Sequence, residues 1–177
     1  MIHYKKCVKQ RLITLILCFT IYNLCITIQV KGKEVFILKV CTFFGHSDCH
    51  ESVYPVLKEK IQELIKNTDV SCFYVGNNGR FDSLAVRALR ELQKEYPHIS
   101  YFVVFAYLPD ESTENSIYPE GLETVPKRFC IDKRNRWMLS KADYVVSYVT
   151  RNIGGAAKFS ALAQKQNKTV FNIALLQ

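Results

Sequence analysis

The chain has 177 residues, 49% of them hydrophobic and 12% aromatic, which excludes an intrinsically disordered protein and suits one domain with a substantial core. The formal net charge of +8 comes mainly from residues 1–33, which carry six basic side chains and no acid, so the other 144 residues carry only +2. The basic balance is therefore poor evidence for nucleic-acid binding, and no nucleic-acid partner is expected.

The first element along the chain is a hydrophobic segment near the N-terminus. Residues Leu12–Val30 form 19 uncharged residues with positive charge on both sides, a length that just reaches the membrane-spanning range. Three interpretations of residues 1–34 stay open: a membrane anchor or uncleaved signal, an extension from a mis-set start, and an extra element packed on the domain. The remaining domain, residues 35–177, is expected in the cytoplasm, with membrane association through residues 12–30 if the segment is an anchor.

The later elements alternate between strands and helices. Apolar runs bounded by turn residues predict strands in the later part of Glu34–Phe44 and over Val70–Val75, Ile99–Leu108, Asp143–Val149 and Thr169–Ala174. Helical spacing of apolar residues predicts helices over Ser52–Asn67, Asp82–Tyr96, part of Arg128–Lys141, and Gly155–Asn167. This order predicts an α/β class protein: a Rossmann-like three-layer domain with a mostly parallel sheet of about five strands.

The stretch between the third strand and the third helix, residues 109–127, has no clear period, and a connection of that length is often functional. The seven cysteines are odd in number, and several lie in apolar runs, which indicates reduced, buried cysteines of a cytosolic domain. The spacing of Cys41, His46, Cys49 and His50 matches no standard zinc pattern, so no metal is expected.

Polar and glycine-containing turns follow three of the predicted strands. They hold Gly45 and His46, then Gly76–Asp82, and then Gly154 and Gly155, which open an alanine-rich helix. Such turns let main-chain amides approach an anion, and a helix N-terminus adds partial positive charge. In a parallel sheet, ligands bind outside the carboxyl ends of the strands, where these turns meet. The pattern therefore predicts a site for a nucleotide-like ligand.

Four blocks of sequence resemble one known family. They are FFGH at 43–46, YVGNNGRFDSLAVRALREL at 74–92, VPKRFCIDKRNRWM at 125–138 and ADYVVSYVTRNIGGAAKFSALA at 142–163. Together they resemble the SLOG superfamily, specifically its YpsA-like branch, over about residues 38–175. The resemblance implies a Rossmann-like sheet that binds nucleotides or nucleotide-derived small molecules, with no cofactor beyond that ligand.

Some relatives in this superfamily, the LOG enzymes, are phosphoribohydrolases with an arginine on the helix before the fourth strand and a Pro-Gly-Gly-x-Gly-Thr-x-x-Glu turn. Arg134 matches the arginine, and Gly154 and Gly155 match the glycine pair, but Ile153 replaces the proline. No carboxylate lies between Arg151 and the C-terminus. Because cleavage of an N-glycosidic bond needs a carboxylate, the LOG mechanism does not carry over intact, and the catalytic residues are unknown.

The leading hypothesis is a non-catalytic module that binds or senses a nucleotide derivative. Amides of Gly76–Arg80 and Gly154–Ala156 would hold phosphates, Arg80 and Arg134 would neutralise charge, and Asp82 or His46 would meet a sugar or base. Asp82 also stands where a helix N-cap is expected. The candidate ligand-binding residues are Gly45, His46, Gly76, Asn77, Asn78, Gly79, Arg80, Asp82, Arg134, Gly154 and Gly155. The alternatives are a nucleotide N-glycosidic hydrolase and a membrane-tethered interaction protein.

Overall fold

The computed structural model describes residues 29–31, 34–36, 38–108 and 115–176, and the chain divides into two compact units, Met1–Leu38 and Lys39–Gln177. In the first unit, β1 (Gln29–Lys31) pairs with β2 (Glu34–Phe36) in antiparallel fashion. The apolar segment 12–30 therefore ends in a strand, and the rest of it lies outside the described residues. Within the ranges that the structure describes, no helix has both the length and the hydropathy to cross a membrane.

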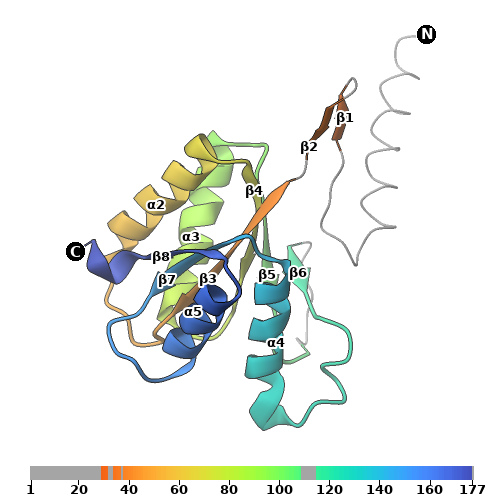
Figure 1. Ribbon diagram of the computed structural model, residues 1–177, viewed down its shortest axis with the longest axis vertical. Helices are drawn as coiled ribbons and strands as arrows, with labels where there is room; N and C mark the ends of the chain where they lie inside the picture. The colour runs from red at the N-terminus through yellow and green to blue at the C-terminus, as the bar shows by residue number, and fades with distance from the viewer. Residues whose placement is uncertain (1–28, 32–33, 37, 109–114, 177) are drawn as a thin grey trace. The chain divides into compact units, whose positions relative to one another are not determined.

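The second unit is an α/β domain built on one sheet (Figure 1). Its strands are β3 (Lys39–Gly45), β4 (Val70–Val75), β5 (Ser100–Val104), β6 (Ser116–Ile117), β7 (Tyr144–Tyr148) and β8 (Thr169–Asn172). Its helices are α2 (Val53–Asn67), α3 (Arg80–Glu95), α4 (Lys127–Lys141) and α5 (Gly155–Lys165), followed by the short 3₁₀ helix η1 (Ile173–Leu175).

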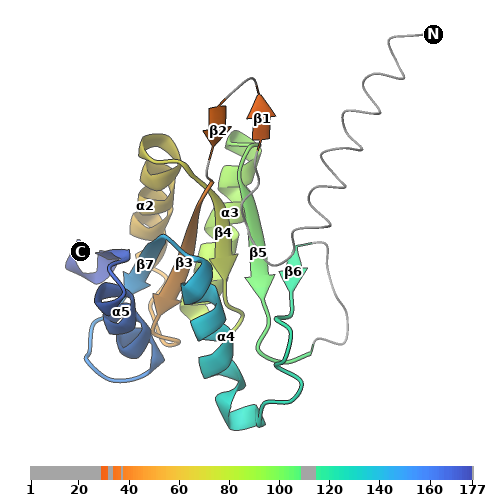
Figure 2. The ribbon, with the colours of Figure 1, turned by 45° about the vertical axis from the view of Figure 1, so that its right-hand side comes forward.

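The sheet has six strands in the order β6-β5-β4-β3-β7-β8, and every pair is parallel. Helices α2 and α3 lie together on one face, and α4 and α5 lie together on the other (Figures 1 and 2). This confirms the predicted Rossmann-like three-layer fold. The sixth strand, β6, comes from the stretch that showed no period in the sequence.

Helical spacing in the sequence correctly identified the buried faces of two helices. The predicted stripe of α2, from Val53 to Ile65, is buried, and so is the stripe of α3 from Leu84 to Leu92. Strand β3 is buried along most of its length because helices cover both faces of the sheet at its centre. The four cysteines in the described part of the chain, Cys41, Cys49, Cys72 and Cys130, are buried and unbridged.

The topology defines where a crevice forms. From β3 the chain moves outward on one side through β4, β5 and β6, and it then returns to β7 on the other side of β3. The loops that follow β3 and β7 therefore leave the sheet toward opposite faces. Such a switch point opens a crevice at the carboxyl ends of the two strands, and that is where the candidate residues lie.

Candidate functional site

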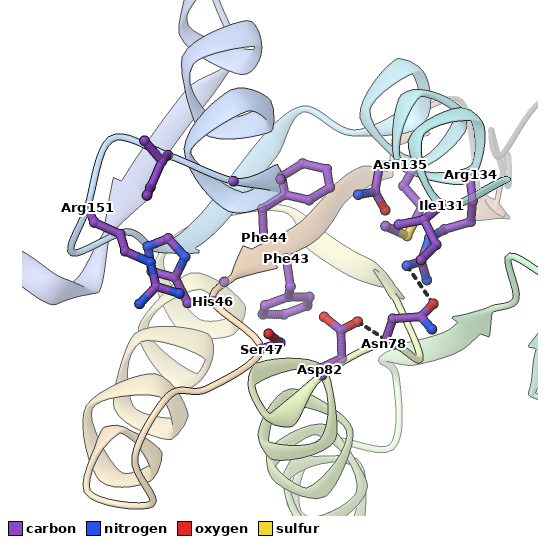
Figure 3. Close-up of a pocket in the computed structure, with 16 residues that line it drawn as sticks. Phe43, Phe44, His46, Ser47, Asn78, Asp82, Ile131, Arg134, Asn135 and Arg151 are labelled. Carbon is purple, nitrogen blue, oxygen red and sulfur yellow. Dashed lines mark hydrogen bonds between the residues drawn. The ribbon is translucent and has the colours of Figure 1, made fainter. Parts of the chain in front are cut away.

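A pocket of about 530 Å³ lies at this switch point, above the carboxyl ends of β3, β4 and β7 (Figure 3). Its lining comes from four segments: residues 43–47 at the end of β3 and just beyond it, residues 78–82 around the start of α3, one face of α4, and residues 151–155 at the turn into α5. Gly79 and Gly155, which belong to two separate predicted turns, share this one crevice.

A buried polar network forms the wall nearest α3 and α4. The carboxylate of Asp82 accepts a hydrogen bond from the Asn78 amide at 2.9 Å. Nη2 of Arg134 donates to Oδ1 of Asn78 at 3.2 Å, and Nη1 donates to the main-chain oxygen of Val104 at 2.8 Å and to Oδ1 of Asn77 at 3.5 Å. Arg134 is only 2% exposed. The arginine therefore holds the loop after β4 in place from the facing helix.

Asp82 is the acidic group of the pocket. Burial raises the pKa of its carboxyl to about 6, and the positive charge of Arg134 and the Asn78 amide oppose that shift. Helix α3 begins at Arg80 with Gly79 as its N-cap, so Asp82 occupies the third helical position and not the N-cap that the sequence suggested. From there its side chain reaches back to the preceding loop.

His46 and Arg151 lie together at the other end of the pocket, beside the β7–α5 loop (Figure 3). His46 is 5% exposed, and its Nε2 has no hydrogen-bond partner among the described residues. Burial lowers the pKa of the imidazole, and the charge of Arg151 lowers it further, against the opposing effect of Asp48. The lowered pKa favours the neutral form of the ring, whose buried Nε2 lies just beneath the pocket surface without a partner among the described residues.

The N-terminus of α5 opens into the same end of the pocket. Gly154 is its N-cap, with φ of +92°, and no side chain caps the helix. A Cβ built on Gly154 or Gly155 would meet no atom of the described residues within 4 Å. Space is therefore open beside the N-terminus of α5, which no side chain of the described residues caps, and the helix dipole there favours an anion.

Apolar side chains complete the lining. Phe43, Phe44 and Met138 form the floor, while Ile131 and Ile153 stand at the rim with 37% and 71% of their surfaces exposed. The pocket thus combines hydrogen-bonding groups and positive charge with an apolar surface suited to a flat ring.

Eight of the eleven predicted site residues line the pocket: Gly45, His46, Asn78, Gly79, Asp82, Arg134, Gly154 and Gly155. Gly76 and Asn77 lie behind it, against the guanidinium of Arg134. Arg80 does not line it: its side chain is 60% exposed, and its Nε lies 4.0 Å from a carboxylate oxygen of Glu51. The predicted role of Arg80 in neutralising the ligand therefore does not fit this geometry.

The loop after β4 also uses its amides differently from the prediction. The amide of Asn78 is bonded to Asp82, and the amide of Arg80 donates to the Ser47 main-chain oxygen at 3.0 Å. A Cβ on Gly79, whose φ is +120°, would lie 2.8 Å from Cα of Ser47. Gly79 is thus explained by packing between two loops, and two amides of this loop already have partners within the protein.

Sequence reasoning missed part of the lining. One face of α4 lines the pocket with Ile131, Asn135 and Met138. These residues share the helical spacing of Arg134, so the sequence signal for them is their position relative to that arginine. Arg151 lies in a polar turn directly after a predicted strand, the same signal that identified Gly154. Trp137, the tryptophan on the same helix, does not line the pocket, because its ring packs on Tyr74 with the ring centroids 5.2 Å apart.

No protein-family model matches this chain, and no curated protein matches it. Among solved structures it is similar to DNA processing protein A (DprA) from Streptococcus pneumoniae, with a TM-score of 0.57 and 16% sequence identity. The similarity covers 76% of this chain and 50% of that one, so the chain spans about half the length of the structure it matches. At this identity the likeness shows a shared Rossmann-like fold.

Proposed function

We propose that this chain is a YpsA-like member of the SLOG superfamily whose pocket binds a nucleotide or nucleotide-derived small molecule and senses it without converting it. The observation that carries the proposal is the end of the pocket formed by α5. There the N-terminus of α5, which no side chain of the described residues caps, lies beside the cationic Arg151. The imidazole of His46 lines the same end, and its buried Nε2 has no hydrogen-bond partner among the described residues. A phosphate group would pair with the helix N-terminus and with Arg151, and it would accept a hydrogen bond from His46 when Nε2 carries the ring proton.

The rest of the pocket supports the remainder of a nucleotide. Asn78, Asp82 and Asn135 offer polar groups that suit sugar hydroxyls or a base edge, and Ile131 and Met138 offer apolar surface on α4. The volume of about 530 Å³ falls within the range of small-molecule sites. A mixed ligand, anionic at one end and flat and apolar at the other, is therefore the best match.

Calorimetric titration of the full-length chain with AMP, GMP, CMP, UMP and NAD⁺, with adenosine as an uncharged comparison, tests the proposal. We expect at least one phosphate-bearing compound to bind with a Kd below about 1 mM and more tightly than adenosine. An absence of binding by every phosphate-bearing compound would contradict the proposal.

A second candidate function, hydrolysis of a nucleotide N-glycosidic bond, is favoured by one observation. Asp82 supplies a buried carboxyl in the pocket with a pKa near 6, which is suited to proton transfer close to neutral pH. In such a step, water would bond to the anomeric carbon while Asp82 accepts its proton. The electron pair of the glycosidic bond would pass to the base nitrogen, which would then take up a proton.

Chromatography of the free base after incubation with the same nucleotides separates the two candidates. Release of base by the wild type but not by Asp82→Asn, with nucleotide binding retained, would establish hydrolysis and overturn the non-catalytic proposal. Arg134 is a poor position for this test because its side chain supports the loop after β4. Loss of activity on its replacement would not distinguish chemistry from folding.

A further inference from the structure

One ion pair joins two of the loops that line the pocket. Nη1 of Arg151, before α5, lies 3.0 Å from Oδ2 of Asp48, and Nη2 lies 3.0 Å from Oδ1. Both side chains are about half exposed, at 49% for Arg151 and 60% for Asp48. Arg151 lines the pocket, whereas Asp48 lies outside the lining. The paired guanidinium therefore stands at the boundary between the pocket and the solvent.

The surroundings of Arg151 favour an anion. Its charge acts on the interior of the pocket, because it lowers the pKa of the buried His46. The uncapped N-terminus of α5 lies on the same loop, three residues further on. His46 lines the same end of the pocket, and its Nε2, buried and without a partner among the described residues, is a polar group independent of the helix. Among the described residues, Asp48 is thus the carboxylate that pairs with Arg151, a group otherwise suited to hold a ligand phosphate.

We propose that Arg151 is the side chain that recognises the anionic group of the ligand, and that Asp48 is a built-in competitor that the ligand must displace. This inference rests on the proposed function of the same pocket. The two parallel contacts that Arg151 makes with the carboxylate are those it would make with two oxygens of a phosphate. A phosphate monoester, with more negative charge than a carboxylate, gains in addition the helix dipole of α5, which Asp48 does not contact.

The exchange is energetically feasible because the pair is exposed. Ion pairs at this level of exposure stabilise a protein little, since water screens the charges and both side chains lose freedom. Asp48 therefore sets a threshold: weakly charged or neutral compounds leave Arg151 paired, whereas a phosphate dianion takes it over. Specificity for phosphorylated ligands follows from this competition.

Inorganic phosphate is the direct probe, titrated into the full-length wild type and three variants: Asp48→Asn, Arg151→Gln and the double variant. Because the lost pair is a weak, exposed one, we expect Asp48→Asn to bind phosphate about two- to fivefold more tightly. Loss of a charge-assisted contact in Arg151→Gln should weaken binding by about tenfold or more. In the Arg151→Gln background, Asp48→Asn should leave phosphate affinity unchanged, because the arginine for which carboxylate and phosphate compete is no longer present.

Glu51→Gln is the matched control. Glu51 lies three residues beyond Asp48 and contacts Arg80 and Arg87, so its replacement removes the same charge nearby while Arg151 stays paired. We expect phosphate affinity to change by less than about 1.5-fold in this variant, because screening weakens an exposed charge at a distance. Equal gains in Glu51→Gln and Asp48→Asn would show that bulk charge alone acts, and the proposal would be wrong. Asp48→Ser, a second removal of the carboxylate, should reproduce Asp48→Asn.

The outcomes separate this inference from the proposed function. If nucleotides bind to the wild type but no protein in the series binds phosphate, and Asp48→Asn leaves AMP affinity unchanged, Arg151 is not the anion contact and this inference fails alone. If the phosphate series behaves as expected while no nucleotide binds, the anion site stands and the proposed ligand class fails. If phosphate and nucleotides both fail to bind, both ideas are overturned.

Discussion

Arg134 on α4 donates a hydrogen bond from Nη1 to the main-chain oxygen of Val104, at the end of β5, over 2.8 Å. Its other contacts, to Asn77 and Asn78, lie in the loop after β4. One buried guanidinium thus connects three segments that are distant in sequence and that meet behind the pocket. The resemblance to LOG enzymes pointed to this arginine as a ligand contact, and the structure gives it a supporting role as well.

Replacement of Arg134 by methionine should therefore destabilise the domain. The change leaves polar groups of Val104 and Asn78 without their partner and removes the positive charge beside Asp82, so we expect a loss of about 3 kcal/mol in the free energy of unfolding. Urea denaturation measures the difference. Arg136→Met, on the exposed side of the same helix where Arg136 pairs with Asp132, should cost less than about 1 kcal/mol. Equal losses in the two variants would contradict the supporting role of Arg134.

Asp82 should make the stability of the domain depend on pH. Its pKa is raised from 3.8 to about 6 in the folded state, so between these values the folded protein binds the proton more readily than the unfolded chain. Stability from this group is therefore highest below pH 4 and falls as pH rises through 6. A pKa difference of roughly 2 corresponds to about 3 kcal/mol.

Asp82→Asn isolates this contribution, because the other titrating groups are common to both proteins. The free energy of unfolding of the wild type minus that of the variant should fall by about 3 kcal/mol between pH 4 and pH 7. Urea denaturation at several pH values measures the two curves. Parallel curves across this range would show that Asp82 titrates normally.

The two glycines before α5 should respond differently to alanine. Gly154 has φ of +92° and ψ of −179°, a conformation that alanine adopts only with strain, so Gly154→Ala should cost about 2 kcal/mol. Gly155 has no positive φ, and a Cβ there meets no described atom within 4 Å. Gly155→Ala should therefore change stability by less than about 0.5 kcal/mol.

The methyl group of Gly155→Ala would stand on the first residue of α5, at the uncapped end of the helix and in space that no described atom occupies within 4 Å. We expect it to weaken the binding of AMP at least about fivefold, because a phosphate must approach those amides closely. Thermal denaturation and calorimetry on the same preparation give both quantities. Unchanged affinity in a normally folded Gly155→Ala protein would show that the ligand does not reach this turn.

Gly76→Ala should be destabilising for a reason unrelated to backbone conformation. A Cβ at this position would lie 2.3 Å from Oδ2 of Asp82 and 2.5 Å from Nη1 of Arg134, so both buried groups would have to move. We expect the free energy of unfolding to fall by about 1–3 kcal/mol, and urea denaturation measures the difference. Gly155→Ala is the matched comparison, since it adds the same methyl group where space is free.

Much of the fold follows from local patterns. The buried faces of α2 and α3 are regular at helical spacing, and β4 is a short apolar run between turn residues, so the sequence contains the information for these elements. The sequence around strand β6 contains no such pattern. It consists of Ser116 and Ile117 alone and exists because they pair with Val103 and Val104 of β5, a tertiary contact that local patterns do not contain.

The site was predictable in location but not in which side chains face inward. The turns after β3, β4 and β7 were expected to meet, and residues from all three line one pocket. Whether Arg80 faces the pocket depends on the first turn of α3. Because Gly79 caps the helix without a side-chain signal, the helix starts two residues earlier than predicted and its first residue, Arg80, turns toward Glu51. Arg151, which belongs to a loop without periodicity, lines the pocket where Arg80 does not.

The packing of Gly79 against Ser47 and the hydrogen bond from the Arg80 amide to Ser47 join two of the pocket loops through their main chains. Such a wall is preorganised, so a ligand that contacts it loses little of its binding energy to the entropy of ordering a loop. The β7–α5 loop meets the segment after β3 at the exposed ion pair between Arg151 and Asp48. Adaptation to ligands of different shape should accordingly be concentrated in residues 150–154, between Val149, which Asn172 holds through two hydrogen bonds, and the start of α5.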